Sequence, residues 1–138
     1  MSKLPKKIVD LINDPESTKV VATADENGHP HIAFKDSLTV LDDGMLAFGE
    51  EFEGSQTNVN LVRSIWFNKY VEMTVRDKNG TTFRIKGKPY RFAHAGPLFK
   101  KFYIAEREKR DPDSELAGVW IVLAGQPHKC APVRGQGP

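Results

Sequence analysis

The sequence is almost without cysteine, since Cys130 is the only one among 138 residues. This excludes an intrachain disulfide and any metal site built from several cysteines, so a redox role would have to come from a cofactor. No motif surrounds Cys130, and we expect it to be an inert thiol near the C-terminal end.

Long apolar runs and a strong excess of one charge are also missing. No stretch is apolar enough to cross a bilayer, and the charged, amphipathic N-terminal segment has no secretory hydrophobic region or cleavage site. We therefore expect a cytoplasmic protein. The formal net charge of +2 is too small to indicate nucleic-acid binding, although it is compatible with small anionic ligands. The sequence also lacks internal repeats and low-complexity blocks.

What is present is enough apolar material, 39% of residues, for one packed core. Alternating apolar and β-branched residues predict about six strands, and Gly-containing turns separate most of them. The expected strands are Lys19 to Asp25, Pro30 to Leu41, Met45 to Gly49, Val71 to Val75, a return strand through Phe83 and Ile85, and Val119 to Ala124.

Helical spacing of apolar residues predicts three short helices, over Leu4 to Asn13, Gln56 to Phe67 and Pro97 to Arg110. Strands that follow one another through tight turns, with only brief helices between them, favour an antiparallel barrel with peripheral helices. We expect one domain over residues 1–124 and a Gly- and Pro-rich tail over residues 125–138.

The segment from Gly49 to Leu61 carries the strongest chemical signal. It runs from the end of a strand through Gly54 into a helix that opens with Ser55, Gln56 and Thr57. Free N–H groups and the dipole of a helix start favour an anion, and these side chains could add donors. Alternatively, Ser55 or Thr57 is simply an N-cap. The neighbouring acidic residues Glu50, Glu51 and Glu53 weaken the anion interpretation.

The order of several motifs resembles the FMN-binding split-barrel family typified by pyridoxamine 5′-phosphate oxidase. The resemblance covers about half of the chain. The matching segments are Ala22-Thr23-Ala24-Asp25, Asn27-Gly28-His29-Pro30, Asp36-Ser37-Leu38-Thr39-Val40, Asp43-Gly44, Ser55-Gln56-Thr57-Asn58-Val59-Asn60-Leu61 and Phe83-Arg84-Ile85-Lys86-Gly87. The fold that this resemblance implies is mainly β: a six-stranded antiparallel split β-barrel with short peripheral helices.

The resemblance further implies a homodimer with FMN in a groove at the interface. Lys35 would be the basic partner of the FMN phosphate, assisted at the helix start by Ser55, Gln56 and Thr57. Phe48 and Gly49 would lie along the isoalloxazine ring or the ribityl chain, Asn60 would be a hydrogen-bond partner one turn later, and Trp120 would border the partner's flavin or pack inside the barrel.

One departure from the family bears on affinity, because many relatives have a Lys or Arg where this chain has Gln56-Thr57. Neutralising the phosphate would then depend more on Lys35, Arg84 or Lys86. The loss of one charge-assisted hydrogen bond corresponds to about 1.5 to 3 kcal/mol, or a tenfold or larger change in binding.

Several other residues have alternative interpretations. His29 and His31 would share one face of a strand, but no third metal ligand is evident, and we expect no metal site. Trp66 is expected to cover the core from its helix. The basic residues of the helix from Pro97 to Arg110 form either a solvated face or the rim of the active-site groove, where their charge would attract an anionic substrate or a partner.

The sequence therefore predicts a flavoprotein in which FMN performs the electron chemistry, most simply an oxidoreductase of unknown substrate. No side chain is a convincing acid or base, so no catalytic residue is assigned. Oxidation of pyridoxamine phosphate is not expected, because the C-terminal part lacks an arginine cluster for a substrate phosphate. The alternatives are a non-enzymatic FMN-binding electron-transfer protein, or a split barrel that uses haem or a deazaflavin.

Overall fold

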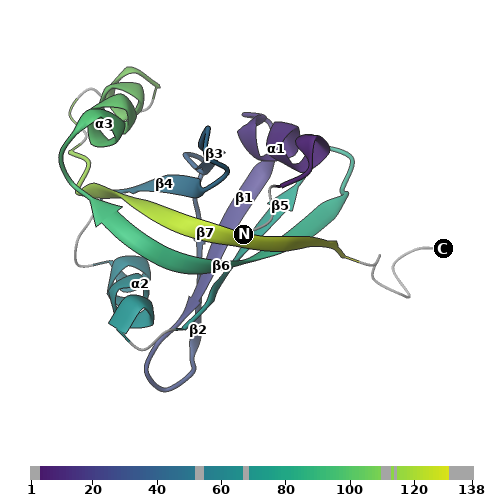
Figure 1. The fold of residues 1–138 in the computed structure, drawn as a ribbon, viewed down its shortest axis with the longest axis horizontal. Coiled ribbons are helices and arrows are strands. Elements are labelled where there is room, and N and C mark those ends of the chain that lie inside the picture. The colour runs from purple at the N-terminus through teal and green to yellow at the C-terminus, as the bar shows by residue number, and fades with distance from the viewer. Residues whose placement is uncertain (1–3, 52–54, 67–68, 110–112, 114, 131–138) are drawn as a thin grey trace.

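The computed structural model describes residues 4–51, 55–66, 69–109, 113 and 115–130. Seven strands form one strongly curled antiparallel sheet in the order β2-β1-β5-β6-β7-β4-β3 (Figure 1). The strands are β1 (Thr18–Ala24), β2 (Pro30–Phe34), β3 (Thr39–Val40), β4 (Leu46–Glu50), β5 (Val71–Arg76), β6 (Thr82–Ala93) and β7 (Gly118–Lys129). The mainly β architecture predicted from the sequence is confirmed, with seven strands in place of six.

The hairpins form where the sequence places its turn residues. In the β1–β2 turn, the side chain of Asp25 accepts hydrogen bonds from the N–H groups of Asn27 and His29, and Gly28 takes a positive φ of 81°. The bond from the His29 N–H lowers the pKa of Asp25, because it stabilises the ionised carboxylate. Gly28 thus supplies the left-handed backbone that the turn requires, and β1 and β2 pair as expected.

The predicted strand from Pro30 to Leu41 is wrong in one respect, because it is two strands. A turn closes between them, with the N–H of Leu38 donating to the carbonyl oxygen of Lys35 at 3.0 Å. The chain then changes partner, so that β2 pairs with β1 whereas β3 pairs with β4. The Asp-Ser pair in this turn has the chemistry that favours a bend, and apolar alternation on either side obscures it.

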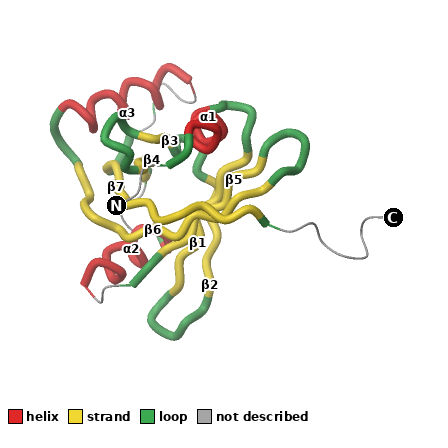
Figure 2. The backbone as a smooth tube through the Cα atoms, turned by 45° about the vertical axis from the view of Figure 1, so that its right-hand side comes forward, coloured by secondary structure: helices red, strands yellow, loops and turns green. Residues whose placement is uncertain are grey.

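Three helices in the described part of the chain flank the curled sheet: α1 (Lys6–Asn13), α2 (Gln56–Trp66) and α3 (Pro97–Lys109). In both views, α2 lies on the opposite side of the long strands β6 and β7 from α1 and α3, and the β1–β2 hairpin projects beyond the rest (Figures 1 and 2). Among the described residues, no helix is long and apolar enough to span a membrane.

The main core fills the inside of the curl. Its largest fully buried side chains include Trp120, Phe48, Ile8, Ile12, Leu46 and Met73. A smaller cluster lies under α3, where Phe102 packs with Ala47, Leu116 and Val119. β4 and β7 lie between the two clusters, and both faces of these strands carry buried residues.

The last strand is longer than predicted. We expected it to end at Ala124, but β7 continues to Lys129, because Pro127 and His128 resume pairing with β6 after an irregular register step. A proline is tolerated at such a step because it need not donate to the ladder. The first part of the predicted tail is therefore strand, and residues 131–138 lie outside the described part of the chain.

Candidate functional site

The candidate site lies where β4 ends and α2 begins, together with Lys35 just after β2. We call this region, comprising Lys35, Glu50, Ser55, Gln56 and Thr57, the α2 corner. A series of contacts runs from Lys35 through the core to α2. The Lys35 ammonium lies 5.7 Å from the centre of the Phe48 ring, and Phe48 is opposite Trp120 in the β4–β7 ladder. The Trp120 indole N–H in turn donates to the side chain of Asn58 in the first turn of α2.

Ser55 is the N-cap of α2. Its hydroxyl oxygen accepts a hydrogen bond of 3.0 Å from the N–H of Asn58, the third residue of the helix. The simpler of the two roles considered for Ser55 is thus present. The first helical turn, all of which is described, contains no acidic residue, so nothing within it opposes an anion at the positive end of the helix dipole.

Lys35 forms an ion pair that the sequence did not reveal. Its ammonium lies 3.1 Å from a carboxylate oxygen of Glu50, and the two side chains are only 14% and 2% exposed. The sequence analysis counted Glu50 against an anion here, and the structure pairs its carboxylate with the lysine that was assigned to the phosphate. No local pattern links Lys35, just after β2, with Glu50 at the end of β4, fifteen positions later, so only the fold brings them together.

Gln56, Thr57 and Asn60 lie on one helix, but they face different surroundings. Gln56 is exposed and donates from its amide to the side chain of Asn60 at 2.7 Å, and Asn60 donates to the hydroxyl of Thr23 at 2.9 Å. Thr57 and Asn60 are 2% and 1% exposed. The hydrogen bonds from Gln56 to Asn60 and from Asn60 to Thr23 connect α2 to β1. Of Gln56, Thr57 and Asn60, Gln56 is the one that is exposed to solvent.

The rings of Phe48 and Trp120 are both fully buried in the core of the single chain. Trp120 packs against Phe92 with ring centroids 4.9 Å apart, so it has the interior role that the sequence also allowed. Phe48 is 0% exposed as a whole residue, so a ligand on the surface of this chain does not reach the ring that was expected to lie along the flavin. Gly49 is tightly held: its N–H donates to the Ser37 hydroxyl at 2.8 Å, and a Cβ there would lie 2.9 Å from Leu116.

A pocket of about 480 Å³ opens beside Gly49, between this part of the sheet and α3. Ser37, Lys19, Lys101 and Lys109 are among its lining residues. Lys19 is only 3% exposed, and burial lowers the pKa of its ammonium. Lys101 and Lys109 of α3 therefore line, together with the carboxylates of Asp36 and Glu106, a pocket of a size suited to a small ligand.

The remaining candidates lie elsewhere. Arg84 and Lys86, considered as alternative phosphate partners, line a different pocket on the outer face of β6. His29 lies 3.4 Å from Asp25, and no group of three or more His, Cys, Asp or Glu residues in the described part of the chain could hold a metal ion. The side chain of Trp66, together with Glu53 and Gly54, lies outside the described residues.

Comparison of the sequence with protein families and with curated proteins finds no match. Solved structures are similar along nearly the whole chain. An FMN-binding protein from Syntrophomonas wolfei is 16% identical over 94% of this chain and 87% of its own, with a TM-score of 0.76. A putative pyridoxamine 5′-phosphate oxidase from Lactobacillus delbrueckii is 23% identical, covering 91% and 93%, with a TM-score of 0.66. The haem storage protein HutZ from Vibrio cholerae is 12% identical, covering 91% and 92%, with a TM-score of 0.61. Identities this low show the fold alone.

Proposed function

We propose that this chain, which has the split-barrel fold of FMN-binding and pyridoxamine 5′-phosphate oxidase-like proteins, binds FMN at the α2 corner and acts as an oxidoreductase. The observation that carries the proposal is the start of α2, the next element along the chain after β4, where a capped first turn without acidic residues begins with Ser55 and Gln56. The same fold in an FMN-binding protein supports it.

The donor set at the α2 corner fits a phosphate. The main-chain N–H groups of the first turn, the Gln56 amide and the Ser55 hydroxyl are neutral donors aligned with the helix dipole. Lys35 brings a full positive charge, but Glu50 shares it. Phosphate binding would then depend mainly on the helix start, and we expect a weaker hold on FMN than a corner with an uncommitted cation would give.

Bound FMN would supply one- and two-electron redox chemistry, and the chain would hold and orient it. No described side chain at the α2 corner is assigned a proton-transfer role. The pocket beside Gly49 would admit the electron donor or acceptor. Its three lysines, Lys19, Lys101 and Lys109, outnumber its two carboxylates, Asp36 and Glu106, which would favour an anionic one. The alternative within the same fold is a protein that carries flavin electrons to another protein without turning over a small substrate.

The test is reconstitution of the purified chain with FMN, followed by its visible absorption spectrum. We expect flavin bands that remain with the protein through gel filtration, and binding of FMN in preference to riboflavin, because the phosphate occupies the helix start. Reduction by NADH or NADPH with passage to a small acceptor would identify an enzyme, and bound but unreactive flavin would identify a carrier. A spectrum showing only haem, or binding only of a deazaflavin, would contradict the FMN assignment.

We also propose that the protein is a homodimer with the flavin at the interface. The edge strand β2 presents Ile32 and Phe34 to solvent at 63% and 72% exposure. On the neighbouring helix α2, Val59 and Val62 are 39% and 40% exposed. An apolar face on a projecting edge strand is the kind of surface that a second copy covers. Its position on β2 and α2, the elements that flank the α2 corner, would place the second chain next to the flavin.

Replacing Phe34 with Ser should shift the protein from dimer to monomer in sedimentation velocity at micromolar concentration. It should also weaken FMN binding, because the flavin would lose one wall of its groove. Ile104→Ser, which removes an exposed apolar side chain from α3, is the matched control and should leave both properties unchanged. A Phe34→Ser protein that stays dimeric and keeps its FMN affinity would refute this interface.

A further inference from the structure

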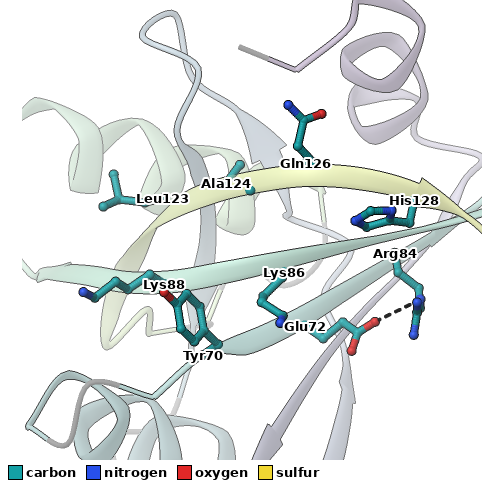
Figure 3. Close-up of a pocket in the computed structure, with 10 residues that line it drawn as sticks. Tyr70, Glu72, Arg84, Lys86, Lys88, Leu123, Ala124, Gln126 and His128 are labelled. Atoms are coloured by element: carbon teal, nitrogen blue, oxygen red, sulfur yellow. Dashed lines mark ion pairs between the residues drawn. The ribbon is translucent and has the colours of Figure 1, made fainter. Parts of the chain in front are cut away.

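The larger of the two described pockets lies away from the α2 corner, on the outer face of β5, β6 and β7. Its volume is about 630 Å³, within the range of small-molecule sites. It shares no lining residue with the α2 corner or with the pocket beside Gly49. Figure 3 shows its side chains, which come from the three strands and from Tyr70, just before β5.

The pocket is basic. Arg84, Lys86 and Lys88 alternate along β6, so all three side chains point to the outer face while Ile85 and Gly87 face the core. Glu72 is the one carboxylate among the lining residues, and it lies 3.4 Å from Arg84. The charges of Lys86 and Lys88 therefore exceed what the pocket's own carboxylate can neutralise, which favours an anionic ligand.

An exposed aromatic ring stands beside these charges. Tyr70 is 59% exposed, and the Lys86 ammonium lies 5.5 Å from its ring centre. In Figure 3 the ring lies next to Lys86 and Lys88, and Leu123 and Ala124 of β7 add apolar surface to the lining. The pocket thus combines a stacking surface with two ammonium groups, the arrangement that suits a ring bearing an acidic group.

The shape of the pocket is built into the strands that form its floor. Ile85 pairs with Pro127 but Gly87 pairs with Ala124, so β7 carries one extra residue at this point. Gly125 lies in this bulge, where a Cβ would come within 3.0 Å of the Lys86 carbonyl oxygen. Bulges redirect side chains and are frequent beside binding sites. After the bulge in β7, His128 pairs with Arg84 of β6, and both residues line the pocket.

We propose that this pocket binds a small ligand made of an aromatic ring with one or two acidic groups. The ring lies against Tyr70, and the acidic group is held by Lys86 and Lys88. The proposal does not depend on flavin binding at the α2 corner, because the two places have no residue in common.

Two probes that share one aromatic framework separate the two contributions. 8-Anilino-1-naphthalenesulfonate carries a sulfonate, and N-phenyl-1-naphthylamine lacks it. Fluorescence titration of the full chain should give saturable binding of the sulfonate probe at one per chain. Lys86→Gln together with Lys88→Gln should lower its affinity about tenfold and leave the neutral probe unaffected. Tyr70→Ala should weaken both probes. Lys78→Gln together with Lys100→Gln makes the same charge change on exposed residues outside the pocket, and should alter neither.

Circular dichroism of each variant shows whether it is folded, and all these side chains are at the surface or pocket wall. Equal affinity of the sulfonate probe for the pocket variant and the control variant would overturn the proposal. Equal affinities of the neutral and the sulfonated probe for the unmodified chain would also overturn the proposal. Displacement of the probe by FMN, with loss of FMN binding in the Lys86 and Lys88 variant, would support an anion site here and refute the α2 corner as the flavin site.

Discussion

Replacing Lys35 with Met is expected to lower the free energy of unfolding by about 2 to 3 kcal/mol. The reason is the surroundings of Glu50, whose side chain is 2% exposed and has the Lys35 ammonium 3.1 Å away. The substitution removes the ammonium that is paired with this nearly buried carboxylate, whereas methionine keeps most of the apolar stem. Urea denaturation at pH 7, with the slope of the transition checked for constancy, measures the change.

The double variant Lys35→Met with Glu50→Gln is the control for this pair. It should recover much of the lost stability, because neither charge remains to be buried, so the two changes should be strongly non-additive. The same proteins test the flavin assignment: Glu50→Gln alone should strengthen FMN binding, since Lys35 would then offer its whole charge to the phosphate. Additive losses of stability would contradict the ion pair as a structural element. An unchanged FMN affinity in Glu50→Gln would remove Lys35 from the phosphate site.

Features set by neighbouring residues could be predicted from the sequence. Asp25 and Gly28 specify a turn that needs only local hydrogen bonds, and α2 begins at Gln56, where Ser55 offers its cap. The division of the strand after Phe34 was missed, because the apolar alternation continues on both sides of the bend. What decides that division is the pairing of Thr39 and Val40 with β4, a contact between distant segments.

Within the candidate site, the start of α2 could be predicted from the sequence, whereas the contacts of its side chains could not. The helix start at Ser55 is where the sequence placed it. The burial of Thr57 and Trp120 depends on how α2 and β7 pack, and the pairing of Lys35 with Glu50 depends on the segment just after β2 lying against the end of β4. The basic pocket on β6 was not anticipated at all. Its signal, the alternation of Arg84, Lys86 and Lys88, looks the same as an ordinary solvated face until the β7 bulge and Tyr70 are placed beside it.

The second large expected effect comes from opposite charges at position 56. Gln56→Lys should tighten FMN binding about tenfold or more, because it adds a full charge where the helix start now offers only neutral donors. Gln56→Glu should weaken binding by a similar factor, so the two variants should differ about a hundredfold in Kd. Gln56 is exposed, so neither side chain has to be buried.

The two variants also separate ligand binding from helix stability, because the helix dipole acts on them in the opposite sense. A glutamate in the first turn stabilises α2 and a lysine there destabilises it, each by a few tenths of a kcal/mol. Both variants lose the 2.7 Å amide bond to Asn60 in its present form, so that loss cancels in their comparison. If FMN affinity followed helix stability, the glutamate variant would bind more tightly, whereas a phosphate at the helix start requires the lysine variant to do so.

Riboflavin, which has no phosphate, should bind both variants with equal affinity. If the two variants also differed about a hundredfold in their affinity for riboflavin, residue 56 would interact with the flavin ring and not with the phosphate.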